Sequence, residues 1–192
     1  MLQDHSTRCH GSEALILMDC RYSHHEKKIS LLESIKACGE RKDLGKGIQI
    51  HTDILRCEDL NLFKKDICIH NALISMYTKC GHLVKAQEVF DELPIRDVVS
   101  WNIIITGCAQ LGLPEEVLDY FDQMQHEGLS PNASTFVCLL KACGATGAIK
   151  EGIQIHEKIL NEGLLKMDIV LGNALVDMYA KSGMLAEAYK VL

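Results

Sequence analysis

Two segments of this chain repeat with a long period. Residues 67–90 align without a gap with residues 169–192, an offset of 102, and eleven of the 24 positions are identical. Residues 36–51 and 141–156 share the strings KACG and GIQIH at an offset of 105, and the three extra residues fall between positions 56 and 65. Self-similarity of this kind indicates an array of similar structural units rather than one irregular core.

The hydrophobic pattern repeats three times within the 102-residue period. We delimit these repeats as 67–97, 98–132 and 133–168, with lengths of 31, 35 and 36 residues. The same pattern assigns 28–66 to a preceding unit and 169–192 to an incomplete one. Residues 1–27 match no complete unit, although residues 12–18 resemble the second helix of a degenerate one. Both ends therefore look like interruptions of a longer array.

Each unit has the pattern of two helices. In the middle unit the first helix is predicted from Ser100 to Gln110, and the second begins at Pro114, whose missing N–H costs nothing in a first turn. The second helix has an apolar stripe at helical spacing, formed by Val117, Tyr120, Phe121 and Met124. Residues 79–81 and 144–147 are predicted as the turns of the flanking units, and Leu93-Pro94 as the end of the first one.

Two short helices cannot bury their apolar faces alone, so neighbouring units must stack. The sequence therefore predicts an all-α fold, a right-handed α-solenoid of tandem helix-turn-helix repeats. The first helix of each unit is expected to line the concave face. A solenoid offers an extended surface, so binding is the expected class of activity.

The familiar signatures of catalysis and metal binding are absent. No GxSxG, P-loop, GxGxxG or HExxH string occurs, and the nine cysteines form no CxxC pair. We predict that the chain is not an enzyme and holds no cofactor or metal. The densest group of possible ligands has no standard zinc spacing, and a solvated segment is favoured there: His5, Cys9, His10, Cys20, His24 and His25. The recurring His51 and His156, and the helical Cys138 and Cys143, are predicted to pack in the core.

Composition excludes two further classes. No apolar segment reaches the eighteen residues of a membrane span, so the chain is not predicted to enter a bilayer. The N-terminal region contains four acidic residues and resembles neither a signal peptide nor an acid-poor transit peptide. No targeting signal is recognisable in this chain.

The units resemble the pentatricopeptide repeat family, specifically its plant subclass with long, short and standard motifs. Residues 98–132 resemble the standard motif, 71–97 and 173–185 the short motif, and 136–160 the long motif. The resemblance covers residues 28–192, about 86% of the chain. It implies sequence-specific binding of single-stranded RNA with one motif per base. It also implies a mitochondrial or chloroplast location and a role in RNA processing or C-to-U editing, with editing or processing factors as further partners.

The resemblance also implies which residues read the bases. In this family the fifth residue of a motif contacts the base and the last residue supports it. The pair Asn71 and Asp97 is associated with uracil and the pair Asn102 and Asn132 with either pyrimidine, while Asn173 has no partner within the chain. The long motifs depart from the pattern, with the pairs Leu32 and Asp66, and Val137 and Asp168. The second residues of the motifs, expected to flank the bases, are Cys68, Val99, Ser134 and Val170.

Three alternatives stay open at the level of sequence. Asn71, Asn102 and Asn173 could serve only as helix N-caps. The net charge of −6 argues against strong non-specific RNA binding. The candidate phosphate contacts, with solvated helix-end charges as the alternative, are Lys36, Lys79, Lys141 and Lys181. The rival function is a protein-binding solenoid of the tetratricopeptide type, which expects a strict 34-residue period. Uncapped ends also predict self-association.

Overall fold

The computed structural model describes residues 24–56, 58–164 and 168–191. These residues form ten α-helices and one 3₁₀-helix, and they contain no β-strand, so the all-α prediction is confirmed. None of the described helices has the length and hydrophobicity that a bilayer span requires. The helices are α1 (His24–Arg41), α2 (Leu44–Arg56), η2 (Glu58–Lys65), α3 (Ile67–Lys79), α4 (Leu83–Asp91), α5 (Val98–Gln110), α6 (Pro114–His126), α7 (Ala133–Thr146), α8 (Ile149–Asn161), α9 (Ile169–Lys181) and α10 (Leu185–Val191).

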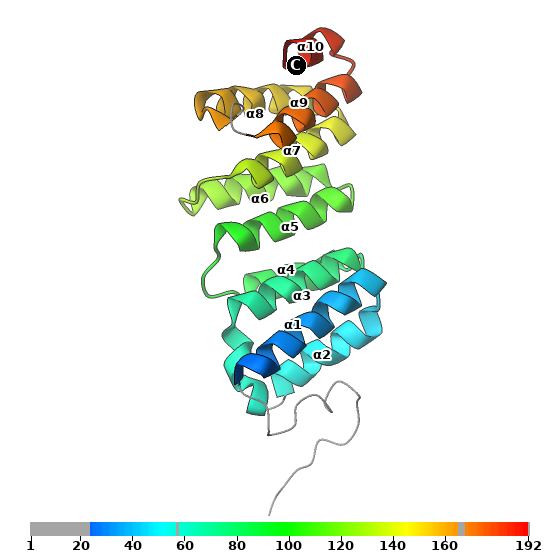
Figure 1. The fold of residues 1–192 in the computed structure, drawn as a ribbon, viewed down its shortest axis with the longest axis vertical. Helices are drawn as coiled ribbons and strands as arrows, with labels where there is room; N and C mark the ends of the chain where they lie inside the picture. Colours follow the sequence, from blue (N-terminus) through cyan, green and yellow to red (C-terminus); the bar gives the residue numbers. More distant parts are fainter. Residues whose placement is uncertain (1–23, 57, 165–167, 192) are drawn as a thin grey trace, which may run out of the picture.

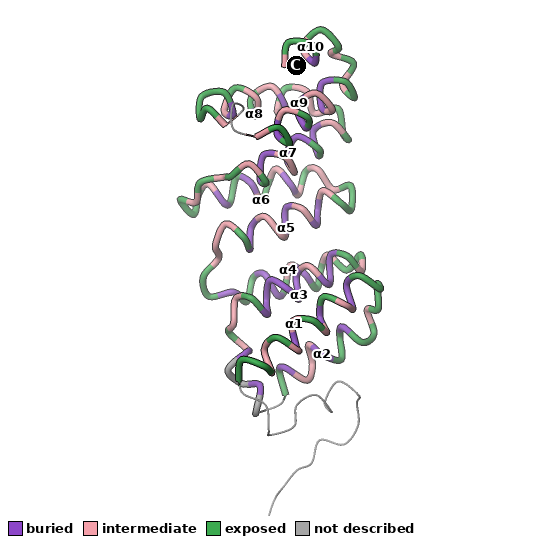
Figure 2. The backbone as a smooth tube through the Cα atoms, viewed as in Figure 1, coloured by how far each residue is buried: buried purple, intermediate pink, exposed green. Residues whose placement is uncertain are grey.

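The helices stack in two layers along one long axis (Figure 1). The odd-numbered helices contact one another in succession, from α1 through α9, and form a continuous layer. The even-numbered helices pack on their own odd-numbered helix and on the next one. Buried residues accordingly lie where the layers and the successive units meet (Figure 2). This is the α-solenoid that the repeat pattern predicts.

One predicted turn is wrong in its position. The segment 144–147 was expected to be non-helical, but α7 continues through Thr146, and Gly147 alone turns the chain with a φ of 72°. An L-residue with a side chain rarely adopts this left-handed conformation, which glycine tolerates. The predicted start of α6 at Pro114 is confirmed.

Gly144 lies inside α7 because the neighbouring helix comes very close there. A Cβ atom at Gly144 would lie 3.2 Å from the Cα of Met178 in α9, and a Cβ atom at Gly39 would lie 3.2 Å from the Cα of Met76 in α3. The glycine of each KACG string therefore permits one close helix crossing, at both places where the string occurs.

The recurring GIQIH strings complete the same contact. The side chains of Met76 and Met178 fill the space that a Cβ atom would take at Gly47 and Gly152, respectively. His51 Nδ1 lies 2.9 Å from the hydroxyl of Tyr77, and the equivalent distance from His156 to Tyr179 is 2.8 Å. Burial lowers the pKa of both imidazoles, which favours their neutral form. Both copies of the repeated strings therefore form the same packing contact between neighbouring helices.

A matched pair of glycine substitutions tests this packing. A Cβ atom at Gly107 in α5 would lie 2.4 Å from Thr78 Cγ2 and 2.7 Å from Thr78 Cβ, whereas nothing lies within 4 Å of a Cβ atom at Gly172 in α9. We expect Gly107→Ala to lower the free energy of unfolding by about 1–3 kcal/mol through overpacking. Gly172→Ala should raise it by up to about 1 kcal/mol, since alanine is the better helix former. Urea unfolding measures both values, and equal signs for the two variants would contradict the α3–α5 packing.

Candidate nucleic-acid interface

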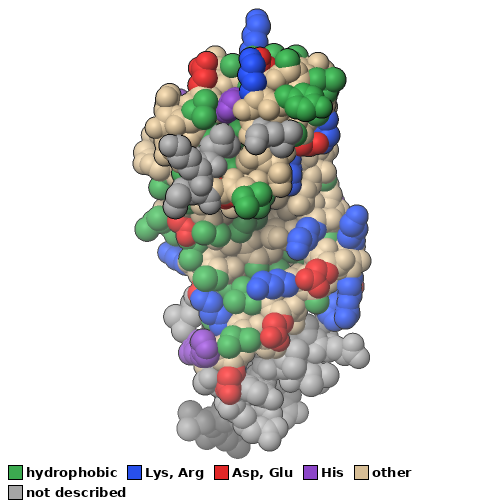
Figure 3. All heavy atoms as spheres, turned by 45° about the horizontal axis from the view of Figure 1, so that its top comes forward, with side chains coloured by type: hydrophobic (Ala, Val, Ile, Leu, Met, Phe, Trp, Pro, Cys, Tyr) green, Lys and Arg blue, Asp and Glu red, His purple; other side chains and the backbone are tan. Residues whose placement is uncertain are grey.

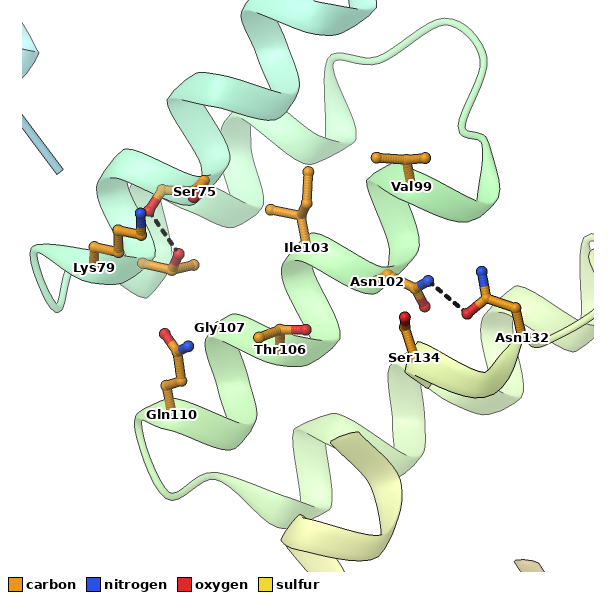
Figure 4. A pocket seen from close by; sticks show the side chains of 11 residues that line it. Ser75, Lys79, Val99, Asn102, Ile103, Thr106, Gly107, Gln110, Asn132 and Ser134 are labelled. Atoms are coloured by element: carbon orange, nitrogen blue, oxygen red, sulfur yellow. Dashed lines mark hydrogen bonds between the residues drawn. The ribbon is translucent and has the colours of Figure 1, made fainter. Parts of the chain in front are cut away.

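A groove of about 390 Å³ opens on the layer of odd-numbered helices, between α3, α5 and the start of α7 (Figure 4). It contains hydroxyl, amide and ammonium groups beside aliphatic side chains, so it offers both hydrogen bonds and apolar contact. The lining residues are Ser75, Thr78, Lys79, Val99, Asn102, Ile103, Thr106, Gly107, Gln110, Asn132 and Ser134. Four of the positions singled out in the sequence, Val99, Asn102, Asn132 and Ser134, meet here.

Asn102 and Asn132 are joined by a direct hydrogen bond. Asn102 Nδ2 donates to Asn132 Oδ1 at 3.1 Å, and both side chains line the groove (Figure 4). The hydroxyl of Thr135 donates to Asn102 Oδ1 at 2.6 Å. Asn102 is half-buried and Asn132 is exposed. The fifth and last residues of the 98–132 unit therefore form one connected set of amide groups at the surface of the groove.

The last residues of the units cap the helices that follow. Asp66 begins α3, Asp97 begins α5, Asn132 begins α7 and Asp168 begins α9, and each side chain accepts hydrogen bonds from backbone N–H groups of its helix. Asn71, Asn102 and Asn173 instead lie inside α3, α5 and α9, so the interpretation of these three residues as N-caps is wrong. N-capping does not explain why asparagine recurs at these three places.

The three internal asparagines have different environments. Asn71 is only 8% exposed, and its Oδ1 is buried without a hydrogen-bond partner. Among the described residues no hydrogen bond joins Asn71 to Asp97, whose Oδ1 accepts from the backbone N–H of Ser100 at 2.8 Å and from its hydroxyl at 2.9 Å. Asn173 is exposed. A direct hydrogen bond therefore joins the pair in 98–132, and none is formed by the pair in 67–97.

The second residues of the units are accessible. Val99 is 56% exposed and Val170 is 63% exposed, and Cys68 and Ser134 are also exposed. Exposed aliphatic side chains at equivalent places in two units have no role in the core. Val99 in addition lines the groove beside Asn102, where it can contact the face of a flat ring.

The long units lack an amide at the fifth position. Leu32 and Val137 are half-buried and pack against the core. Asp66 bonds Lys28 at 2.6 Å, and despite its partial burial this bond and the helix N–H groups hold the pKa of its carboxyl below the usual range. Asp168 accepts from the backbone of Val170 at 2.8 Å. Both aspartates are thus engaged in capping.

Acidic residues are absent from the three helices around the groove. The helices α3, α5 and α7 contain no Asp or Glu, whereas α6 contains four acidic residues and no Lys or Arg. Figure 3 shows Lys and Arg side chains on both sides of the face in view, with more of them along its right side. The net negative charge of the chain therefore does not extend to the groove, where Lys79 contributes a positive charge.

Two of the four candidate lysines do not lie at helix ends as predicted. Lys79 and Lys181 end α3 and α9, but Lys36 and Lys141 lie one turn or more before the ends of α1 and α7, because those helices are longer than expected. All four are exposed. Lys181 is paired with Asp177 at 2.7 Å.

The cysteines of the described core are structural. Burial raises the pKa of the Cys143 thiol to about 11 and that of Cys108 to about 12, so both stay protonated. Cys138 is half-buried and its Sγ lies 3.0 Å from the hydroxyl of Thr106. No three His, Cys, Asp or Glu side chains converge in the described parts of the chain. Of the six possible ligands weighed near the N-terminus, only His24 and His25 lie within these parts.

Thr135 is the residue that the sequence reasoning missed. It is fully buried, and it contacts both Asn102 and Asn132. A signal was present, since Thr135 follows Asn132 by three residues, the spacing of a capping box.

Family patterns match this chain in three places. The pattern described as PPR repeat family matches residues 96–145, and the pattern described as PPR repeat matches residues 68–98 and 173–192. Together they cover about half of the chain.

Curated relatives from Arabidopsis thaliana carry the same repeats. One pentatricopeptide repeat-containing protein is 40% identical over 83% of this chain and 22% of its own length. A chloroplastic one is 34% identical over 97% of this chain and 30% of its own length. A mitochondrial one is 38% identical over 100% of this chain and 21% of its own length. The chain thus spans less than a third of the length of these relatives.

Solved structures support the same assignment at the level of fold. The crystal structure of the pentatricopeptide repeat protein PPR10 in complex with an 18-nucleotide psaJ RNA element has a TM-score of 0.71 and 22% identity to this chain. The match covers 86% of this chain and 24% of that one. The structure of PPR10 from maize gives a TM-score of 0.63 at 22% identity, over 84% of this chain and 23% of that one. The repeat pattern, the stacked helix pairs and these matches agree, and the chain belongs to the pentatricopeptide repeat family.

Proposed function

We propose that this chain binds single-stranded RNA in a sequence-specific manner, with the groove between α3, α5 and α7 as a contact site. The observation that carries this proposal is the hydrogen-bonded pair Asn102 and Asn132, which opens on the groove beside the exposed Val99. An amide offers donors and an acceptor, the groups needed to match the edge of a pyrimidine base. Val99 would cover the face of that base.

The charges of the helices around the groove support the same surface. RNA affinity depends on neutralising phosphates, and the absence of Asp and Glu from α3, α5 and α7 limits repulsion around the groove. Lys79, at the edge of the groove, is our candidate phosphate contact there. Because few cations line the groove, base contacts must supply a larger share of the affinity than in a strongly basic protein.

Base selectivity is the direct test. We expect short single-stranded RNAs with pyrimidines opposite residues 67–132 to bind more tightly in fluorescence anisotropy, at fixed salt, than RNAs with purines there. Asn102→Thr, whose side chain is shorter and lacks the amide, should move the preference at one base only toward the larger purines. A change of about 10-fold in relative affinity is expected, as for loss of a bidentate base contact. Equal binding of all RNAs by the folded protein would contradict the proposal.

The finer parts of the proposal concern the longer protein context. The relatives include chloroplastic and mitochondrial proteins, which supports an organellar location. The unit lengths of 31, 35 and 36 residues support the plant subclass with long, short and standard motifs. We propose a role in organellar RNA processing or C-to-U editing, together with processing or editing factors, in which these residues bind RNA without catalysing a reaction.

A second candidate activity is self-association of the chain. Leu185 and Tyr189 on α10 are 61% and 77% exposed, and such apolar side chains at one end of the array favour self-association of the isolated chain. Concentration-dependent sedimentation separates self-association from RNA binding, because only the first requires no nucleic acid.

A further inference from the structure

The 98–132 unit differs from its neighbours in how its base-facing amide is held. Asn102 Oδ1 accepts a hydrogen bond from Thr135 Oγ1 at 2.6 Å, while Asn102 Nδ2 donates to Asn132 Oδ1 at 3.1 Å. Both ends of the Asn102 amide are therefore occupied on the protein side. Each end keeps one further capacity, a second N–H on Nδ2 and a second lone pair on Oδ1.

Thr135 has one hydroxyl proton, and its contacts show where that proton goes. Thr135 Oγ1 lies 2.6 Å from Asn102 Oδ1 and 3.1 Å from Asn132 Oδ1, and it accepts from the backbone N–H of Asn132 at 3.1 Å. The shorter distance assigns the proton to Asn102. Asn132 Oδ1 is already supplied by the backbone N–H of Thr135 at 3.1 Å and by Asn102.

These contacts determine which way the Asn102 amide faces. If the amide turned over, its oxygen would face Asn132 Oδ1, and two acceptors would oppose each other. Asn132 cannot turn over in response, because its Oδ1 caps α7. The hydroxyl of Thr135 adds the second restraint, since it places a donor against Asn102 Oδ1.

We propose that Thr135 is a positioning residue that fixes the orientation of the Asn102 amide, and so sets which bases the 98–132 unit accepts. The inference rests on the proposed RNA binding. Thr135 belongs to the following unit, so base choice in this unit depends on a third side chain that touches no base. Thr135 is completely buried and acts only through Asn102 and Asn132.

The other described junctions lack this arrangement. Ser100, the third residue of the unit that follows 67–97, corresponds to Thr135 and should face Asn71. Its hydroxyl instead donates to Asp97 Oδ1 at 2.9 Å. Ile69 and Leu171, the third residues of 67–97 and 169–192, have no hydroxyl. The effect of Thr135 is therefore expected at one base only.

The test compares four single-stranded RNAs that differ only in the base facing Asn102. Thr135→Val removes the hydroxyl and keeps the side-chain shape, Thr135→Ser keeps the hydroxyl, and Ser100→Ala is the matched deletion in the neighbouring unit. We expect Thr135→Val to reduce the ratio between the weakest and the tightest dissociation constants by about 3- to 10-fold, which is the range for one lost hydrogen bond. Thr135→Ser and Ser100→Ala should keep the wild-type ratio at this base.

The binding results distinguish failure of the positioning role from failure of the proposed RNA binding. The variants are compared at a temperature at which circular dichroism shows all of them folded, because Thr135 is buried. If Thr135→Val keeps the wild-type ratio, or weakens all four RNAs equally, the positioning role is overturned while RNA binding stands. If the wild-type chain is folded and binds none of the RNAs, the proposed function is overturned, and this inference with it.

Discussion

Replacing Trp101 with alanine is expected to lower the free energy of unfolding by about 3–5 kcal/mol, the range for removing a large aromatic side chain from a core. Trp101 is 1% exposed and packs edge-to-face on Phe90, with ring centroids 4.8 Å apart. Its Nε1 donates to Glu127 Oε2 at 3.3 Å, and Glu127 also pairs with Arg96 at 3.1 Å. The substitution therefore opens a cavity and breaks a bond at the junction of two units.

The consequence for the array should be visible in thermal unfolding. A single domain is stable by about 5–15 kcal/mol, so this loss is a large fraction of the total. Circular dichroism should show the melting temperature reduced by about 10 °C. Tyr189→Ala is the control, because this side chain is 77% exposed and its truncation should change stability by less than about 0.5 kcal/mol. Similar curves for both variants would show that the α5 junction does not depend on Trp101.

Sequence periodicity predicts the architecture well because the repeat has a direct physical cause. Two helices per unit, the start of α6 at Pro114 and the stacking of units all follow from apolar spacing and turn residues. The position of Gly144 within α7 does not, because a glycine permits either a turn or a close crossing. Only the nearby backbone of Met178 shows that the crossing is the reason for glycine here.

The sequence indicates which positions recur in the units, but it does not predict the burial or the hydrogen bonds of the side chains at those positions. Asn71 and Asn173 occupy equivalent places in the two aligned segments, yet one is buried and the other exposed. Burial at these places depends on which helix packs alongside, and α5 follows α3 in the stack. Capping was also undetermined, because Asp97 and Asn102 are both suitable N-caps by residue type. The dihedral angles and hydrogen bonds of the structure assign the cap to Asp97.

Asn71→Leu is expected to raise the free energy of unfolding by about 1–2 kcal/mol. Asn71 Oδ1 is buried and accepts no hydrogen bond, and an unsatisfied buried acceptor costs about 1–3 kcal/mol. Leucine has a similar size and carries no polar group, so the cost disappears without leaving a cavity. The same substitution at the exposed Asn173 should leave the stability unchanged, and urea unfolding of the two variants measures the difference.

Asn71→Leu should reduce base selectivity in RNA binding, although it raises the free energy of unfolding. Asn71 Oδ1 has no partner inside the protein, and once the side chain turns outward from its buried position it can accept the N3–H of a uracil, so Asn71→Leu should lose the preference for uracil at that base by about 10-fold. A purely structural asparagine would give lower stability on substitution and no change in selectivity. Higher stability combined with lost selectivity would mean that Asn71 is retained for reading a base at the expense of folding. Lower stability would overturn that assignment.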